Sequence, residues 1–386
     1  MRNERNALKP WLKIIRAVSL VVLVLTAPAL ARETWDGVER IVAVGDVHGD
    51  YGQFVAVLRS AGLIDEKEDW TGGTTHLVQT GDVPDRGPDT RKILDLLMKL
   101  EKQARKAKGF VHPLIGNHEA MNVYGDLRYV IPEEYAAFAD GKSERVRERF
   151  YEQHVEELKR NPPAEGMPEI NDAYRAKWEQ DHPLGYFEHR IAFQPDGEYG
   201  KWIRNNNAVI KINDTIFLHG GIGPKYVNED LGKLNQAIQR ELNDFSRLKE
   251  GIAIDPEGPL WYRGLAQNDE QTEEPNLQAV LKNYGVGRVV IGHTPTAGTI
   301  MPRFGGRVVM IDVGMSAAYG GRLACLLIEG GKAYAIHRGK KLELPGDSPG
   351  EMLKYLTAAA ALDPQPSPLA PEIKRLESSA VGAGAR

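Results

Sequence analysis

The chain alternates short apolar runs with longer segments of helical periodicity. Seven runs are rich in β-branched residues, and several are almost continuously apolar and end at glycine, which is typical of buried strands in an α/β sheet. These predicted strands lie within residues 40–46, 76–82, 110–117, 208–221, 288–293, 307–314 and 322–330.

Apolar residues recur at helical spacing in two segments between the first strands. These segments are residues 51–62 and 89–109, and the second stops at Gly109 with Lys and Arg in its last turns. Because strand and helix patterns alternate, we predict the α/β fold class.

Two regions depart from this alternation. Residues from about 132 to 199 are charged, aromatic and helix-prone, and we predict a helical insertion that covers one edge of the sheet. A pair of solvated helices without a role is the alternative. Residues 341–386 are rich in Pro, Ala and Ser, which predicts a tail without a fixed fold apart from one helix over 350–361. Residues 32–340 would then form the main domain.

The N-terminus has the pattern of a secretory signal peptide. Basic residues precede 15 uncharged residues, Ala17 to Ala31, and Ala29-Leu30-Ala31 has the small-x-small form of a cleavage site. The alternative is a membrane anchor, but the run is shorter than the roughly 20 residues that a bilayer span needs. We therefore predict cleavage after Ala31, export to the bacterial periplasm and no stable membrane insertion afterwards.

The composition indicates a globular protein and argues against some kinds of partner. The 386 residues are 42% hydrophobic, enough for a sizeable core, and Cys325 is the only cysteine, so no intramolecular disulfide can form. The formal net charge of −4 provides no basic field, and we therefore do not expect a nucleic-acid partner.

Polar residues flanked by glycine follow five of the predicted strands. Glycine permits sharp turns and lets an ion or a phosphate approach the backbone. The motifs are GDVHGD with Asp46 and His48, GDVPDRG with Asp82, GNHE with Asn117, HGG with His219 and IGHT with His293.

This set of side chains has the chemistry of a metal site. Carboxylate, imidazole and amide groups without a thiolate suit Mn²⁺, Fe or Zn²⁺ rather than a calcium cage or a structural zinc site. Six candidate ligands are too many for one tetrahedral ion. They suit two ions about 3.5–4 Å apart that share a carboxylate and lower the pKa of a bridging water.

The ordered motifs resemble those of the calcineurin-like metallophosphoesterases, and specifically the PPP family of protein phosphatases. The segments NHEAMNVYGDLRYV, GPLWYRG, IGHTPT and IDVGMS are similar to the Shewanella-like branch, and the resemblance extends from about Ile41 to Ile336. It implies a central β-sandwich of two mixed sheets flanked by helices.

The resemblance also implies roles for individual residues. One metal would be held by Asp46 and His48, the other by Asn117, His219 and His293, with Asp82 bridging the two. His118 would be the general acid, oriented by Asp85, whose carboxylate favours the imidazolium. The phosphate would be held by Arg86 and Arg263, with Asn117 sharing that contact, and Glu119 would fix the loop.

We therefore expect a phosphomonoesterase in which a metal-bridging hydroxide attacks phosphorus directly. The expected cofactors are two divalent ions, with Mn²⁺ first, and the expected substrate is a protein or peptide phosphorylated on Ser, Thr or Tyr. Two alternatives remain at this point. One is a nucleotide-directed hydrolase such as a symmetrical dinucleoside tetraphosphatase, and the other is a non-catalytic binding module of the cell envelope.

The remaining histidines lack a glycine-flanked motif. We expect His76, His112 and His337 to be structural residues of the core. The three histidines of the charged insertion, His154, His182 and His189, are expected to be solvated. No chemistry is assigned to Asp50 or Asp312.

Overall fold

The computed structural model describes residues 32–164, 166–346 and 348–383, and Glu33–Arg386 forms one compact unit. The predicted signal peptide, residues 1–31, lies outside the described residues. In the described part of the chain, no helix combines the length and the apolar character that crossing a bilayer requires.

One sheet is built on three parallel strands that follow one another in the chain. Its order is β12-β11-β10-β2-β3-β4, with bounds Lys340–Glu343, Lys332–His337, Ala324–Glu329, Arg40–Val44, His76–Gln79 and Phe110–Pro113. β2, β3 and β4 pair in parallel and are buried almost throughout. β10, β11 and β12 continue the sheet in antiparallel pairing, and the sheet is therefore mixed.

The second sheet is also mixed. Its order is β1-β5-β6-β7-β9-β8, with bounds Thr34–Trp35, Val209–Ile212, Thr215–Leu218, Arg288–Ile291, Val308–Met310 and Met301–Arg303. β6, β7 and β9 are parallel to one another, and β1 is parallel to β5, whereas β5 is antiparallel to β6 and β8 is antiparallel to β9. All seven segments predicted as strands contain strands of these two sheets.

The ends of β2 and β9 bring the two sheets together. At Gly45, directly after β2, an added Cβ would lie 2.3 Å from the carbonyl oxygen of Ile311, directly after β9. Only glycine allows this approach. Since Asp46 and Asp312 come next along the two segments, the approach places both carboxylates at one point between the sheets.

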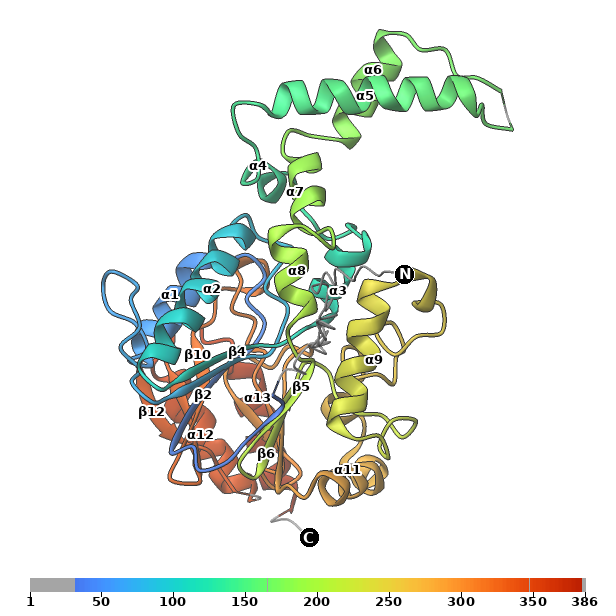
Figure 1. Ribbon diagram of the computed structural model, residues 1–386. Helices are drawn as coiled ribbons and strands as arrows, with labels where there is room; N and C mark the ends of the chain where they lie inside the picture. The colour runs from blue at the N-terminus through green and yellow to red at the C-terminus, as the bar shows by residue number, and fades with distance from the viewer. Residues whose placement is uncertain (1–31, 165, 347, 384–386) are drawn as a thin grey trace, which may run out of the picture. The chain divides into compact units, whose positions relative to one another are not determined.

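Helices cover the outer faces of the sheets. Figure 1 shows α1 and α2 beside the sheet that contains β2 and β4, and α9 and α11 beside the sheet that contains β5 and β6. The bounds are α1 Tyr51–Ser60, α2 Thr90–Lys106, α9 Leu231–Asn243 and α11 Glu270–Tyr284. The short helices α3 and α10 span Asn117–Tyr124 and Gly264–Gln267. The expected fold class, two mixed sheets flanked by helices, is confirmed.

The region expected to be a helical insertion contains five helices. They are α4 Pro132–Ala136, α5 Ser143–Arg160, α6 Asp172–Asp181, α7 Tyr186–Ala192 and α8 Glu198–Arg204. Aromatic rings pack between them: Phe150 on α5 stacks on Phe187 of α7 with centroids 4.1 Å apart, and Tyr151 contacts Trp178 of α6 at 5.1 Å. The insertion therefore has a small aromatic core of its own.

The expectation that His189 is solvated is wrong. Its side chain is fully buried, with ring centroids 5.3 Å from Tyr135, 4.8 Å from Phe138 and 4.6 Å from Phe193. Neither ring nitrogen has a hydrogen-bond partner among the described residues. The burial of His189 could not be predicted from the charged composition of the insertion. Composition is an average over a whole helix, whereas burial depends on the face of the helix on which a residue lies.

His189 should make folding stability fall in mild acid. Burial, with a smaller contribution from Arg190, lowers its pKa to about 3, while an unfolded histidine titrates near 6.5. Between these pH values the unfolded chain binds one more proton at this position, so the free energy of unfolding falls by about 1.4 kcal/mol per pH unit as pH decreases. The stability that His189 contributes is fully present above pH 6.5 and is lost progressively as the pH falls from 6.5 towards 3.

Urea denaturation of the parent protein and of a His189→Phe variant at pH 7.5 and pH 5 would measure the effect. The variant, which carries no titrating group at this position, should gain stability relative to the parent at pH 5. An equal difference between the two proteins at both pH values would contradict the prediction.

The C-terminal region is more ordered than its composition predicts. Besides α12, Pro349–Ala360, which matches the predicted helix, the structure has a second helix, α13, Ala370–Ala383, so the prediction of a tail with one helix is wrong. Tyr355 is buried and donates to the carbonyl oxygen of Ile300 at 2.8 Å. The buried Asp363 accepts from Arg338 at 2.8 Å and contacts His337 at 3.0 Å. A few well-placed buried groups thus anchor a segment whose average composition is typical of disorder.

Candidate metal centre

The polar residues singled out after the predicted strands lie at the carboxyl ends of parallel strands. Asp46 and His48 follow β2, Asp82 follows β3, and Asn117 begins α3 shortly after β4. His219 follows β6 and His293 follows β7 of the other sheet. Carboxyl ends of parallel strands share one edge of a sheet, and this is where open α/β sheets bind ligands.

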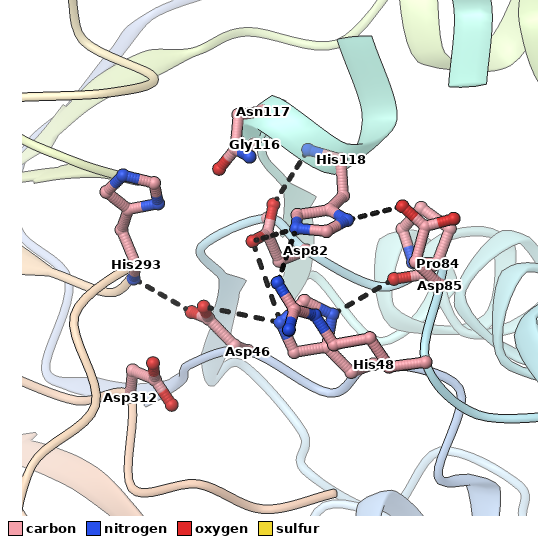
Figure 2. Close-up of polar contacts among 12 residues, drawn as sticks. Asp46, His48, Asp82, Pro84, Asp85, Gly116, Asn117, His118, His293 and Asp312 are labelled. Carbon is pink, nitrogen blue, oxygen red and sulfur yellow. Dashed lines mark hydrogen bonds and ion pairs between the residues drawn. The ribbon is translucent and has the colours of Figure 1, made fainter. Parts of the chain in front are cut away.

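Four of these six side chains, together with His118, form two buried triads that share Asp82. One triad consists of His48, Asp82 and His118, and the other of Asp82, His219 and His293, with the ligand atoms of each triad within 4.8 Å of one another. Asp82 Oδ2 lies 3.2 Å from His219 Nε2 and 3.8 Å from His48 Nε2. Figure 2 shows the contacts of the Asp82 carboxylate with His48 and His118 as dashed lines.

The other two predicted ligands border the triads. Asp46 Oδ2 lies 3.9 Å from His48 Nε2, and Asp46 Oδ1 accepts from the backbone N–H of His293 at 3.0 Å (Figure 2). Asn117 Oδ1 lies 2.9 Å from His219 Nε2. All six predicted ligands therefore converge.

Hydrogen bonds from the far side of the rings orient two of the imidazoles. His48 Nδ1 lies 3.1 Å from the carbonyl oxygen of Pro84, and His219 Nδ1 lies 2.9 Å from that of Thr80. A carbonyl oxygen can only accept, so Nδ1 carries the proton in both rings and Nε2 presents its lone pair toward Asp82. This arrangement is typical of metal-binding histidines.

Two observations show that the donor set fits cations. His293 Nε2 is buried without a hydrogen-bond partner among the described groups, while its Nδ1 lies 3.0 Å from His219 Nε2. In addition, buried carboxylates crowd the centre: burial, then Asp312 and Asp82, raise the pKa of Asp46 well above its usual range. Burial and Asp82 raise the pKa of Glu119 to about 7. Positive ions would stabilise the ionised form of such a cluster.

The backbone at the centre adopts conformations that are uncommon for residues other than glycine. His48, Asp82 and His293 have φ angles of 45°, 59° and 64°. The left-handed region is disfavoured for residues with a Cβ, and it persists where the surrounding contacts hold it, commonly at functional sites. Three of the six predicted ligands are therefore held in strained backbone conformations.

Glu119 and Gly116 secure the loop that carries Asp82. The Glu119 carboxylate accepts from the backbone N–H groups of Asp82 at 2.8 Å, Val83 at 2.7 Å and Gly116 at 2.8 Å. A Cβ at Gly116 would lie 2.4 Å from Asp82 Oδ1, so this position requires glycine. The contacts match the loop-fixing role expected for Glu119.

His118 and Asp85 form a buried hydrogen-bonded pair beside the triads. Asp85 Oδ2 contacts His118 Nδ1 (Figure 2). Asp85 Oδ1 accepts from Asn122 Nδ2 at 3.0 Å. Burial alone would lower the pKa of His118, but the carboxylates of Asp82 and Asp85 outweigh it and raise the pKa above 6.5. The pair can therefore hold a proton at His118 near neutral pH.

The two arginines expected to bind phosphate lie in different surroundings. Arg86 Nη2 is 3.4 Å from His118 Nε2, and its guanidinium lies 4.6 Å from the ring centroid of Tyr129 and 5.2 Å from that of Tyr319. Arg263 Nη1 instead donates to the carbonyl oxygen of His293 at 2.8 Å. Arg86 thus faces His118 directly, whereas Arg263 lies at the edge of the centre.

Sequence reasoning missed three residues here. Asp312 is buried beside Asp46 (Figure 2), and burial raises its pKa to about 6. Part of its signal was present, since Asp312 follows a core strand and Gly314 comes two residues later. Tyr129 lies on a loop and Tyr319 in a short 3-10 helix, and only the fold places both rings on Arg86.

Comparison with known proteins agrees with this geometry. Residues 39–297 match the calcineurin-like phosphoesterase family. An uncharacterized protein of Schizosaccharomyces pombe is 34% identical over 79% of this chain and 82% of its own. Shewanella-like protein phosphatase 2 of Arabidopsis thaliana is 33% identical over 72% of each chain. A crystal structure of a cold-active protein-tyrosine phosphatase from a psychrophilic Shewanella species is 27% identical, with a TM-score of 0.62 over 82% of this chain and 83% of that one.

The family match covers more than half of the chain, and it spans Asp46, Asp82, Asn117, His219 and His293. Two sheets of the expected kind, a His/Asp centre of the dinuclear type and relatives along most of the chain lead to one conclusion. The protein belongs to the calcineurin-like metallophosphoesterases and is related to the Shewanella-like protein phosphatases.

Proposed function

We propose that the protein is a phosphoprotein phosphatase that uses two divalent metal ions, with Mn²⁺ as the first candidate. The observation that carries the proposal is the buried Asp85–His118 pair beside two triads that share Asp82, with Arg86 3.4 Å from His118. This arrangement combines a metal site, a proton donor and a phosphate-binding cation within one centre.

Each group has a defined task in this proposal. The metal ions, held by Asp46, His48, Asp82, Asn117, His219 and His293, would activate water and polarise the phosphoryl oxygens. Arg86 binds phosphate oxygens with its planar guanidinium, which the two tyrosine rings hold in place. His118 donates its proton to the oxygen of the departing alcohol or phenol, and Asp85 keeps the ring oriented.

A protein or peptide substrate is favoured by the surroundings of Arg263. A cleft of about 550 Å³ adjoins the centre here, lined in part by Trp261, Tyr262 and Arg263, and the Trp261 ring lies 5.8 Å from that of His293. A cleft of this size can receive side chains that flank a phosphorylated residue. Two relatives are themselves called protein phosphatases, the Arabidopsis protein and the Shewanella protein-tyrosine phosphatase.

The test is a substrate panel assayed on residues 32–386 with and without added Mn²⁺. Export with removal of residues 1–31 belongs to the proposal, and this form of the protein is therefore the relevant one. We expect metal-dependent hydrolysis of phosphopeptides, and the panel of Ser-, Thr- and Tyr-phosphorylated peptides decides the preference among them. Faster hydrolysis of diadenosine tetraphosphate than of any phosphopeptide would instead make it a nucleotide-directed hydrolase. Failure to hydrolyse para-nitrophenyl phosphate under every metal condition would exclude catalysis.

A further inference from the structure

Glu134 in the helical insertion and Tyr129 just before it hold the backbone of the dipeptide Asp85–Arg86. The N–H of Asp85 donates to Glu134 Oε1 on α4 at 3.3 Å, and the N–H of Arg86 donates to the carbonyl oxygen of Tyr129 at 3.1 Å. Both residues of the dipeptide are in the left-handed region, with φ of 73° and 67°. The insertion and the loop that leads into it thus supply the hydrogen-bond partners for a strained turn of the centre.

This turn needs such support. The left-handed conformation is unfavourable for residues with a Cβ, so two in succession relax unless neighbouring groups hold them. Relaxation at Asp85 would rotate its carboxylate away from His118, because the carboxylate direction follows from the backbone conformation. The contacts with Glu134 and Tyr129 therefore bear on the geometry of the proton donor.

Glu134 occupies an unusual position for a carboxyl group. It is fully buried, whereas the preceding Glu133 on the same helix is exposed, and its Oε2 has no hydrogen-bond partner among the described groups. Burial, with Asp85 adding to it, raises the pKa of Glu134 to about 8. At neutral pH Glu134 is therefore mostly uncharged.

A second set of contacts links the insertion to the same pair. Arg190 on α7 donates to the backbone carbonyl of Asn122 on α3 at 2.6 Å. The side chain of Asn122 donates to Asp85 Oδ1 and to the carbonyl oxygen of His118, each at 3.0 Å. Both the Asp85 backbone and the Asp85 carboxylate are thus held by groups that belong to the insertion or contact it.

We propose that Glu134 is a positioning residue for proton donation: it holds the Asp85 backbone so that the Asp85 carboxylate keeps His118 aimed at the leaving group. The proposal rests on the function proposed above. It also gives the insertion a role in catalysis, although the insertion contributes none of the six predicted metal ligands.

The test compares two substrates whose leaving groups differ in their need for a proton. An alkyl alcohol, as from a phosphoserine peptide, must be protonated as it leaves, whereas para-nitrophenolate leaves readily without a proton. Glu134→Leu, which removes the acceptor for the Asp85 N–H, should lower kcat for the phosphoserine peptide roughly 10- to 100-fold, as expected for a displaced catalytic group. For para-nitrophenyl phosphate the loss should stay within about 3-fold.

Two further variants separate positioning from mere structural support. Glu134→Gln keeps an oxygen that can accept from the Asp85 N–H, so both substrates should stay within about 3-fold of the parent. Glu133→Gln is the matched control on the exposed side of α4 and should change neither rate. If Glu134→Leu does not fold, Glu134→Met takes its place as a variant of similar length without an oxygen acceptor.

A measurement without substrate keeps this inference separate from the proposed function. In the metal-free protein, the proton shared by His118 Nδ1 and Asp85 should give a low-field proton NMR signal that persists in Glu134→Gln and disappears in Glu134→Leu. If the parent hydrolyses no phosphopeptide, the proposed function fails, and the NMR signal still decides the role of Glu134. An unchanged signal in Glu134→Leu, or an equal loss of rate on both substrates, would overturn the inference.

Discussion

Replacement of Asp82 by asparagine is expected to abolish metal-dependent turnover. Asp82 belongs to both triads, with its Oδ2 3.2 Å from His219 Nε2 and 3.8 Å from His48 Nε2. In the parent, the backbone N–H of His118 donates to Asp82 Oδ1 at 3.0 Å. Asparagine has almost the same shape as aspartate and keeps an oxygen that can accept this hydrogen bond. The variant therefore removes the shared negative charge while leaving the loop nearly intact, and kcat should fall by at least about 10³-fold.

Elemental analysis alongside kinetics would measure this result. The parent should bind two metal ions per molecule at saturation, and Asp82→Asn should bind fewer. Asp65→Asn is a suitable control, because Asp65 is an exposed loop carboxylate that undergoes the same chemical change. Full activity together with two bound ions in Asp82→Asn would exclude a bridging role for Asp82.

Replacement of His118 by asparagine should have the second-largest effect. Proton donation contributes roughly 10² to 10⁴-fold to the rate, so hydrolysis of a phosphoserine peptide should fall by a factor in this range. Hydrolysis of para-nitrophenyl phosphate should fall much less, since its leaving group needs no proton. His154→Asn, at a half-exposed histidine of the insertion, serves as the control.

The same variant decides between two roles that the geometry allows for His118. Its ring lies within the first triad, 3.7 Å from Asp82 Oδ2, and it also pairs with Asp85. If His118 donates a proton, the variant keeps both metal ions and the two substrates respond differently. If His118 binds a metal ion, the metal content falls and both substrates lose rate together.

Much of the centre could be predicted because its chemistry is encoded locally. A carboxylate or an imidazole directly after a buried strand, with glycine beside it, is visible in the sequence at Asp46, Asp82 and His293. Parallel strands then carry such residues to one edge of a sheet without any further information. The strands themselves were predictable for the same reason, because a buried strand needs a continuous apolar run.

Other features depend on contacts between distant segments and were missed or wrong. Asp312 follows a core strand as Asp46 does, but nothing in the sequence indicates that the ends of β2 and β9 meet. His189 lies in a charged segment, yet its helix face packs on Tyr135 and Phe138. The second C-terminal helix has a composition typical of disorder, although Leu369 just before it is buried.

The sequence by itself determined the strands, the polar residues that follow them beside glycine, and the types of donor group in the centre, because each is a property of a few neighbouring residues. Only the tertiary structure decided that Asp82 is shared by two triads, that Tyr129 and Tyr319 hold Arg86, and that the insertion contacts Asp85. Those arrangements arise where segments far apart in the chain pack together, and their geometry depends on strand register and backbone conformation that residue types alone do not specify.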